Sequence, residues 1–458
     1  MDSPTGSADL LVRVRTGPLS KSEVPEPPAQ SRRRVAEALR PLLRQFLGDG
    51  VPVRFEFWDG SAIEATGALP PVPAVVRVRS VDAVRRILWA PGEIGLARAF
   101  VAGDLEIDGD VVATLRALRK ASSGDIWRLG VRALPAAVTG AREVGALRPP
   151  PPPPPEEARP RGRRHSPGRD AQVISHHYDV GNEFYGLVLG PTMTYSCARF
   201  ADGATDLEDA QRDKHELICR KLGLHETRGA RLLDVGCGWG SMALHAAGRH
   251  GAFVVAITLS TAQAQYARQR VVEAGLGDRI EIRLQDYRDL RGERFDAISS
   301  VGMFEHVGAA HMARYFETLH ALLVPSGRML NHAISSSGSS RITSRSFIGR
   351  YVFPDGELQD VGEVLLAMER AGFEIRDVES LREHYSRTLR AWIGNLESHW
   401  PRAAALVGAG RARVWRLYMA GSAVGFDDGG LGIHQVLGVV PGADGSSAMP
   451  MTRDGWVL

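Results

Sequence analysis

Three glycines follow directly after an apolar segment, where a ligand can approach the backbone. The segment RLLDV leads into Gly236-Cys237-Gly238-Trp239-Gly240, and a helical pattern comes next. Glycines at this position let the chain turn sharply and bring its backbone close to a ligand. A dinucleotide loop has the spacing G-x-G-x-x-G, whereas this loop has G-x-G-x-G after Asp234. The loop suits S-adenosylmethionine (SAM), whose amino-acid part can bind loop backbone groups and which has no pyrophosphate.

Two polar segments further along the chain complete this predicted site. Each follows an apolar, strand-like segment, and the carboxyl ends of adjacent parallel strands are where open α/β sheets bind ligands. Their polar groups can hold a ribose and an adenine, and the Tyr287 ring can cover the base. The predicted SAM-binding residues are Asp234, Gly236, Gly238, Gly240, Thr258, Leu259, Gln263, Gln285, Asp286 and Tyr287.

A second set of residues has the chemistry of a reactive site, namely Cys197, Glu305, His332 and Tyr385. Glu305 and His332 each follow an apolar, strand-like segment, so we expect both at the top edge of the sheet near the methyl donor. Each residue alone also has an ordinary explanation: a buried thiol, a charge at a helix N-terminus, a core histidine and an amphipathic tyrosine. A reactive site and these ordinary structural roles both remain open as explanations at this point.

Alternating strand-like and helix-like segments from Ala171 onward must position these residues. They include ARLLDVGCG, SMALHAAGRHG, AFVVAITLS, TAQAQYARQRVVEAG, IEIRLQDY, FDAISSVGMF, AHMARYFETLHALL and GRMLNHAI. Such alternation is typical of a doubly wound α/β domain with a parallel sheet. We therefore expect an α/β fold class, with a Rossmann-like SAM methyltransferase domain over residues 171–458.

Residues 31–120 predict a separate, small α+β domain. The segment 31–47 places apolar residues at helical spacing opposite arginines, so this helix either lies on an anionic lipid surface or packs against its own domain. Strand-like segments around an Asp59-Gly60 turn follow, and then helical segments around a glycine-rich loop. The domain has no obvious catalytic cluster, which indicates a role in binding or scaffolding.

Two segments differ in composition from the predicted domains. Residues 1–30 are rich in serine, proline and small residues, and we expect them to be a disordered leader. Residues 121–170 contain the proline run Pro149–Pro155 and then an arginine-rich stretch, and we expect them to be a semi-rigid linker.

Composition and charge exclude several classes of protein. The chain has 458 residues, of which 44% are hydrophobic and 24% charged, as in a soluble protein of more than one domain. It lacks both the ~20 apolar residues of a membrane helix and a secretory signal, so we expect a cytoplasmic protein. The net charge of +3 argues against nucleic acid as a partner. The three cysteines have no zinc-type spacing, so we expect no metal site.

These segments together resemble the cyclopropane fatty acyl phospholipid synthase family, which includes the mycolic acid cyclopropane synthases and related SAM-dependent lipid methyltransferases. The resemblance extends from residue 171 to about residue 435 and rests on HHYDVGNEFYGLVLGPTMTYSCARF, LLDVGCGWG, ITLS, LQDYRDL, VGMFEHVG, NHAI, FPDGEL and HYSRTLRAW, in family order. The segment GEIGLARAFVAGDLEIDGDVV also resembles the lipid-binding N-terminal domain of the members that act on phospholipids. This favours acyl chains of membrane phospholipids as substrates.

The resemblance implies a reaction at the cis double bond of an unsaturated acyl chain. The alkene takes the methyl carbon of SAM, and a bound bicarbonate removes a proton from the resulting carbocation so that a cyclopropane ring closes. A diffusible base stabilises the cation electrostatically, whereas a protein nucleophile there would risk alkylation. The implied bicarbonate-binding residues are Cys197, Gly302, Glu305, His332, Ile334 through its backbone N–H, and Tyr385. By the same matching Tyr195 contacts SAM, and we expect Phe304 and Tyr351 to line the acyl-chain tunnel.

The chain departs from the family pattern at Ser241, Asn331 and Ala333 without losing an implied ligand. Because Asn331 and Ala333 flank His332, the fate of the cation stays open. Loss of a different proton would give a methylene-branched chain for a separate flavin- or NADPH-dependent reductase. Two other hypotheses are a methyltransferase of a soluble metabolite and a non-catalytic lipid carrier. The resemblance also implies a homodimer and peripheral binding to the inner face of the membrane.

Overall fold

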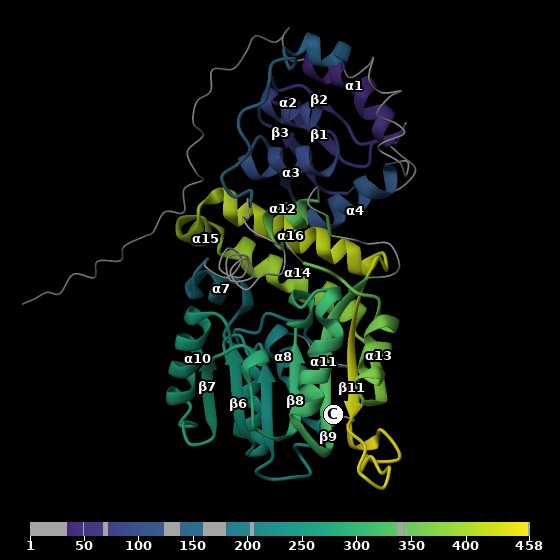
Figure 1. Cartoon of the computed structure of the whole chain (residues 1–458). Coiled ribbons are helices and arrows are strands. Elements are labelled where there is room, and N and C mark those ends of the chain that lie inside the picture. The colour runs from purple at the N-terminus through teal and green to yellow at the C-terminus, as the bar shows by residue number, and fades with distance from the viewer. Residues whose placement is uncertain are drawn as a thin grey trace, which may run out of the picture.

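A computed structural model shows two sheets with a layer of helices between them (Figure 1). The structure describes residues 34–48, 50–66, 72–122, 138–158, 180–201, 206–336, 342–343, 346–354 and 356–456. The predicted leader, residues 1–30, and the arginine-rich part of the predicted linker from Arg159 to Arg169 lie outside these residues.

The N-terminal part is built on a four-stranded sheet in the order β2-β1-β3-β4. Its elements are α1 Arg34–Leu47, β1 Arg54–Phe57, β2 Ala62–Ile63, β3 Val75–Val78, α2 Val81–Trp89, α3 Glu93–Ala102, β4 Leu105–Asp108 and α4 Val111–Ala121. Val35 and Leu39 on α1 are buried in the core of this part, so the structure favours packing as the role of the basic helix. Strand β4 was not predicted, because its short LEID segment lies between two helical patterns.

The second sheet has seven strands in the order β10-β11-β9-β8-β5-β6-β7. The strands are β5 Arg231–Val235, β6 Phe253–Thr258, β7 Ile280–Leu284, β8 Phe295–Val301, β9 Leu323–Ser336, β10 Glu374–Ser380 and β11 Leu431–Val439. Strands β5 to β9 are parallel, and β11 is antiparallel to both β9 and β10. The strand order reverses between β5 and β8, and ligands bind at the carboxyl ends of strands at such a reversal.

Helices cover both faces of this sheet, which confirms the predicted doubly wound α/β fold class (Figure 1). Helices α8 (Leu207–Lys221), α9 (Ser241–His250) and α10 (Thr261–Glu273) pack on one face. Helices α11 (Met312–Ala321) and α13 (Val361–Arg370) pack on the other face. Successive strand residues point to opposite faces. Leu232 of β5 accordingly lies in the core under α8, α9 and α10, and Leu233 lies in the core under α11 and α13.

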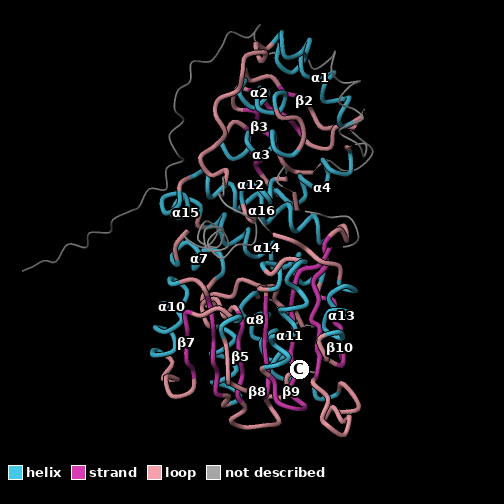
Figure 2. Tube along the Cα trace, in the orientation of Figure 1, coloured by secondary structure: helices cyan, strands magenta, loops and turns pink. Residues whose placement is uncertain are grey.

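A layer of helices lies between this sheet and the N-terminal part, as Figures 1 and 2 show. Its main helices are α14 (Arg382–Ser398), α15 (Trp400–Val407) and α16 (Ala409–Asp427). Helix α16 packs against α14 and also against α3 and α4. Arg413 of α16 lies 3.2 Å from a Glu106 carboxylate oxygen, and Arg416 donates to the Ile107 carbonyl at 2.8 Å. The two parts therefore share a polar interface.

The remaining described helices are short. They are α7 Asn182–Leu189, α12 Phe347–Tyr351, and the single 3₁₀ turns Tyr287–Asp289, Phe304–His306, Ala309–His311 and Asp454–Trp456. Helix α7 contacts the helix layer, and α12 contacts α3. Within the described residues, none of the helices is both long and apolar enough to cross a membrane.

Part of the predicted linker packs against the folded parts and does not hold them apart. Arg86 of α2 donates to the carbonyls of Pro151 and Pro152, at 3.4 and 3.0 Å. Proline has no N–H, so a proline run can meet a neighbour only through its carbonyls and its ring. A free spacer is therefore the wrong description of residues 138–158, whose Ala141 and Ala146 are buried.

Glu157 at the end of this segment joins three parts of the chain. Its carboxylate is 2% exposed and accepts hydrogen bonds from Arg98 of α3, at 2.8 and 2.9 Å, and from Arg350 of α12, at 2.9 Å. Burial alone would raise the pKa of this carboxyl, but Arg98, Arg350 and the Tyr351 hydroxyl together outweigh burial, and the pKa is lowered. A lowered carboxyl pKa stabilises the fold above the unfolded-state pKa, and this stabilisation is lost as the pH falls through the folded-state pKa.

We expect Glu157→Gln to lower the free energy of unfolding by about 2 kcal/mol near neutral pH, because two arginines lose a charged acceptor. The difference from the parent protein should shrink below about pH 4, where the parent carboxyl also becomes neutral. Thermal unfolding across this pH range measures it. Glu143→Gln, at an exposed position of the same segment, is the control. A loss that does not change with pH would contradict the assignment.

Candidate functional site

The glycine loop connects β5 to α9, as predicted. Gly236, Gly238 and Gly240 have φ values of 78°, 54° and 83°, in the left-handed region that favours glycine. Gly236 excludes a side chain for a second reason, because a Cβ there would lie 2.8 Å from the Met303 side chain. A Cβ at Gly238 would meet no atom within 4 Å. Backbone conformation thus requires all three glycines, and close packing adds a second requirement at Gly236.

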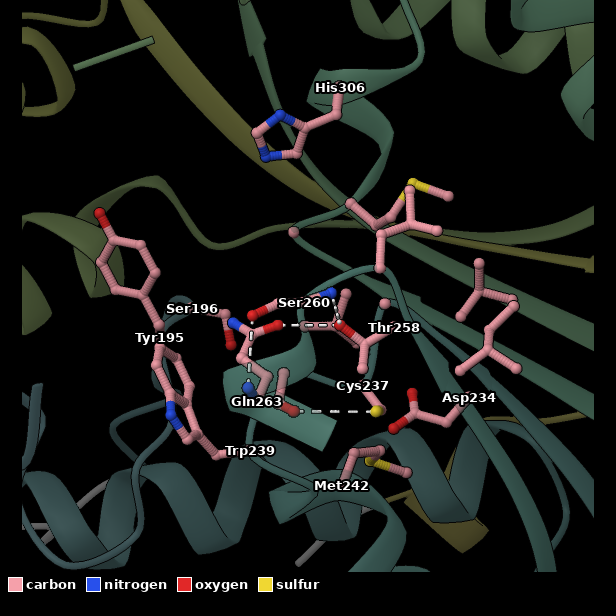
Figure 3. A pocket seen from close by; sticks show the side chains of 18 of the residues that line it. Tyr195, Ser196, Asp234, Cys237, Trp239, Met242, Thr258, Ser260, Gln263 and His306 are labelled. Carbon is pink, nitrogen blue, oxygen red and sulfur yellow. Dashed lines mark hydrogen bonds between the residues drawn. The ribbon is translucent and has the colours of Figure 1, made fainter. Parts of the chain in front are cut away.

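A cavity opens at the carboxyl ends of β5, β6, β7 and β8, with the glycine loop as one wall (Figure 3). Of the predicted SAM-binding residues, all except Gly240 line it: Tyr195, Asp234, Gly236, Gly238, Thr258, Leu259, Gln263, Gln285, Asp286 and Tyr287. A Cβ at Gly240 would lie 3.2 Å from the side chain of Ala267 on α10. That glycine therefore allows close packing of the start of α9 against α10.

Asp234 is the buried carboxyl at the end of β5. Its Oδ1 accepts a hydrogen bond from Ser299 Oγ at 2.8 Å, whereas Oδ2 has no partner among the described residues. Burial raises the pKa of this carboxyl to about 6. A buried acceptor without a partner is costly unless a ligand donates to it. The arrangement suits a cationic donor such as an amino group.

The second and third polar segments line the same cavity. Thr258 Oγ1 donates to Gln263 Oε1 at 2.9 Å and accepts from the Ser260 N–H at 3.2 Å. Figure 3 shows these three side chains together, with Trp239 and Tyr195 beside them and His306 across the cavity. These hydroxyl and amide groups are neutral and can exchange their mutual bonds for bonds to a ribose.

The Asp286 carboxylate already has a strong partner. Arg288 donates to it from the backbone N–H at 2.8 Å and from the guanidinium at 3.0 and 2.6 Å. Burial would raise the pKa of Asp286, but the bonds from Arg288 outweigh burial and lower it. The Arg288 guanidinium also lies 5.8 Å from the centre of the Tyr287 ring. Arg288 thus holds in place both side chains that we predict to contact the adenine.

Lys214 is a cavity residue that the sequence analysis missed. Its side chain is wholly buried on α8, and Nζ donates to Ser196 Oγ at 2.9 Å. Burial lowers the pKa of this ammonium group to about 7. One signal was present, because the chain uses arginine almost everywhere and has only four lysines. An ammonium group fits a closed pocket that a planar guanidinium would not.

The residues of the second predicted set take part in two local groups of contacts. Glu305 Oε1 accepts the Ile334 N–H at 2.7 Å, and the Gly302 N–H donates to the His332 carbonyl at 2.8 Å. The Cys197 thiol lies 3.7 Å from the Leu381 carbonyl, which also accepts the Tyr385 N–H at 3.1 Å. Of these residues only Gly302 lines the cavity. The others lie behind the cavity wall.

His332 lies inside β9 and does not follow it, contrary to the prediction, because β9 extends to Ser336. Its ring is fully buried, and neither ring nitrogen has a partner among the described residues. Burial lowers the pKa of His332 well below its usual value, so the ring is neutral. Glu305 Oε2 is also buried and without a described partner. Burial raises the pKa of Glu305 to about 7.

Gln435 is a second residue that the sequence analysis missed. It lies on β11 directly opposite His332 in the antiparallel ladder, so both side chains are on the same face. Gln435 is fully buried, and its amide oxygen and nitrogen have no partner among the described residues. Unsatisfied polar groups thus come from Glu305 in the 3₁₀ turn after β8, His332 on β9 and Gln435 on β11.

Burial raises the pKa of the Cys197 thiol well above its usual value. The sulfur therefore stays protonated and is a poor nucleophile, and its S–H faces the Ala198 and Leu381 carbonyls, at 3.1 and 3.7 Å.

Aromatic rings separate the cavity from the helix layer. Tyr195 packs against Tyr185, Trp392 and Trp415 with ring centres 5.7, 5.4 and 5.6 Å apart. Its hydroxyl lies 3.3 Å from that of Tyr418 on α16. Phe304 and Tyr351, the expected tunnel residues, have described contacts elsewhere. Phe304 packs between Tyr315 and Phe316 in the core, and the Tyr351 hydroxyl donates to Glu157.

Known proteins share both the sequence and the fold. The family model described as mycolic acid cyclopropane synthetase matches residues 165–436. The chain is 42% identical to a probable fatty acid methyltransferase of Mycobacterium tuberculosis, covering 88% of this chain and 95% of that protein. It is 33% identical to the cyclopropane-fatty-acyl-phospholipid synthase of Escherichia coli, covering 80% and 87%. The crystal structure of mycolic acid cyclopropane synthase CmaA1 complexed with SAH and CTAB matches with 32% identity and a TM-score of 0.55, covering 59% and 98%.

Proposed function

Because the chain belongs to the mycolic acid cyclopropane synthetase family and is a SAM-dependent methyltransferase, we propose that it alkylates the cis double bond of unsaturated acyl chains in membrane phospholipids. The observation that carries this proposal is the group of buried, unsatisfied polar atoms of Glu305 and His332 behind the SAM cavity. Gly302 connects the SAM cavity to this polar group, since it lines the cavity and its N–H donates to the His332 carbonyl.

The residues around the cavity suit the parts of SAM. When bound, SAM supplies an electrophilic methyl group, and its transfer to an alkene leaves a carbocation on the acyl chain. Asp234 Oδ2 is available to accept from the amino group. Thr258 and Gln263 are available for the ribose, and Tyr287, held by Arg288, is available for the adenine ring.

The second set of residues fits a bicarbonate ion. Bicarbonate supplies one O–H donor and several acceptor oxygens, and as a base it takes the proton that the carbocation must lose. The unsatisfied atoms match these groups, since Glu305 Oε2 is an acceptor and neutral His332 has one donor and one acceptor nitrogen. The Glu305 carboxylate also favours positive charge nearby.

We expect Gln435→Leu to reduce turnover at least about tenfold while leaving SAM affinity unchanged. In this proposal the Gln435 amide orients His332 or the anion, and a side chain of similar size removes only that polar group. The substitution also removes an unsatisfied buried amide, so the thermal stability should stay the same or rise. Initial rates and thermal unfolding measure the two effects. Full activity in the variant would show that Gln435 has no part in the reaction.

The N-terminal part offers a surface for phospholipid. Trp89 at the end of α2 is 57% exposed and Leu96 of α3 is 47% exposed, on helices that pack against each other. Exposed tryptophan and leucine side chains are typical of proteins that lie on a membrane interface. The E. coli relative is named for a phospholipid substrate, and its match spans 80% of this chain.

The proposal is tested by incubating the purified protein with methyl-labelled SAM and oleoyl phospholipid vesicles and identifying the product. The released fatty acids are examined by proton NMR, because cyclopropane and methylene products have the same mass. Upfield ring protons are the expected result. The amount of labelled lipid should fall when bicarbonate is removed. A soluble acceptor offered without vesicles should not become labelled. Absence of labelled lipid would overturn the proposal in favour of a soluble substrate.

A methylene-branched product is the second candidate, and one observation favours it. The relative with 42% identity carries the name fatty acid methyltransferase, whereas the relative named cyclopropane synthase has 33% identity. In this outcome the same cation loses a different proton, and the NMR spectrum shows vinylidene protons. A separate reductase would then have to supply the two electrons that convert the methylene group into a methyl branch.

A further inference from the structure

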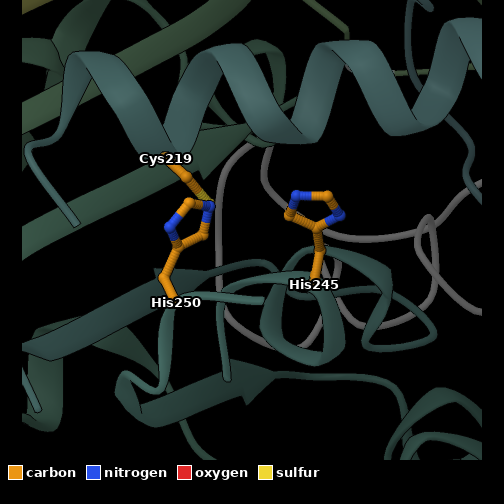
Figure 4. Close-up of side chains that lie close together, drawn as sticks. All are labelled: Cys219, His245 and His250. Atoms are coloured by element: carbon orange, nitrogen blue, oxygen red, sulfur yellow. The ribbon is translucent and has the colours of Figure 1, made fainter. Parts of the chain in front are cut away.

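Four side chains with metal-binding groups face one another between α8 and α9, on the sheet face that carries the SAM cavity. Cys219 lies on α8, and His245 and His250 lie on the last part of α9 (Figure 4). One ligand atom from each of the three lies within 4.8 Å of the others. Glu216 lies one turn before Cys219 on α8 and contacts both histidines.

Glu216 is bound as a fourth ligand would be. Its Oε2 lies 3.0 Å from Nε2 of His245 and 3.0 Å from Nε2 of His250. Its Oε1 accepts from Arg220 at 2.9 Å, which fixes the orientation of the carboxylate.

The cluster is enclosed yet reachable from solvent. Cys219 is fully buried, while the side chains of His245, His250 and Glu216 are 11%, 9% and 22% exposed. Tetrahedral zinc places its sulfur and nitrogen ligands about 3.5 Å apart, so small rotations of the rings would complete the geometry. A hydrogen-bond network alone explains the histidine and glutamate contacts. The Cys219 thiol belongs to the core beside the sheet and adds a sulfur ligand atom next to the two rings.

We propose that Glu216, Cys219, His245 and His250 bind one zinc ion that joins α8 to α9. A thiolate and two imidazoles are soft or intermediate donors that select zinc over magnesium or calcium. One thiolate and one carboxylate balance the two charges of the ion, so the half-buried site would be neutral. The sequence predicted no metal site, because the ligands come from two helices and have no zinc-finger spacing.

The location gives the ion a structural role. All four positions would be filled by protein, which is typical of structural zinc and leaves no open position for catalysis. Helix α9 begins at the glycine loop, and His215 of α8 both lines the SAM cavity and packs its ring 5.7 Å from that of His245. A bond between the two helices would therefore hold the glycine loop against the cavity residues of α8.

Cobalt titration of the metal-free, full-length protein without a histidine tag tests the proposal. We expect one equivalent of Co²⁺ to give a thiolate-to-cobalt charge-transfer band and the strong visible bands of a tetrahedral site, and Zn²⁺ to displace it. Excess Zn²⁺ should also raise the unfolding temperature by several degrees. Cys237→Ser, at the thiol of the glycine loop, is the control and should keep both effects.

Two variants locate the site. Cys219→Ser should abolish the charge-transfer band and weaken metal binding at least about 100-fold. His250→Gln keeps an N–H donor for Glu216 but removes a metal ligand, so it should fold normally and bind cobalt at least about tenfold more weakly. Absence of stoichiometric binding in the parent protein, or an unchanged band in Cys219→Ser, would show that the cluster is a hydrogen-bond network only. Neither result depends on the substrate or product of the enzyme.

Discussion

Replacing Glu305 by glutamine should lower turnover at least about 100-fold while changing the affinity for SAM less than about twofold. The carboxyl does not line the SAM cavity, so the variant removes a negative charge without touching the cofactor. Glutamine keeps an oxygen that can accept the Ile334 N–H, now at 2.7 Å from Glu305. The loss should therefore appear in kcat and not in folding.

Single-turnover rates with labelled SAM and oleoyl vesicles measure this effect, and calorimetry measures SAM binding. Glu317→Gln, on the exposed face of α11, is the matched control and should have parental activity. Since burial raises the pKa of Glu305 to about 7, the ionised form accumulates above that pH. At a fixed bicarbonate concentration the parental rate should rise through about pH 7, and the glutamine variant should lack this rise. An active variant would exclude Glu305 from the reaction.

Features that depend on local sequence patterns could be predicted from the sequence. The glycine loop and the Gln285-Asp286-Tyr287 segment each follow a strand directly, Thr258 ends one, and parallel strands bring their carboxyl ends to one edge. All three segments line the cavity for that reason. Their positions required only the order of strands and helices along the chain.

Other features arise from contacts between distant segments, and no local pattern predicts them. Gln435 faces His332 only because β11 inserts antiparallel between β9 and β10. Lys214 lies in a helix of low mean hydropathy, where the spacing of residues suggests exposure, yet the sheet and the TYSC segment bury it. The packing of residues 138–158 within the predicted linker was missed in the same way, because Arg86 and Arg98 make these residues part of an interface.

Replacing Gly236 by alanine should weaken SAM binding at least about 30-fold and abolish measurable turnover. The φ of 78° costs a residue with a Cβ roughly 1–2 kcal/mol. The added Cβ would also lie 2.8 Å from the Met303 side chain, beside Gly302 at the cavity wall. The loop or Met303 must move, and either change alters the cavity. Equilibrium binding of SAM and the labelled-lipid assay measure the two losses.

Gly238→Ala separates packing from backbone strain. Its φ of 54° is also left-handed, but a Cβ there would meet no protein atom within 4 Å. In the absence of a ligand this variant should therefore be more stable than Gly236→Ala, because it carries the strain without the collision. Since Gly238 lines the cavity, its Cβ still takes up space that SAM would occupy. Both variants should thus lose SAM affinity, but only Gly236→Ala should lower the thermal stability of the ligand-free protein by several degrees. Equal stabilities would show that Met303 yields freely, and the second requirement for glycine at position 236 would then be wrong.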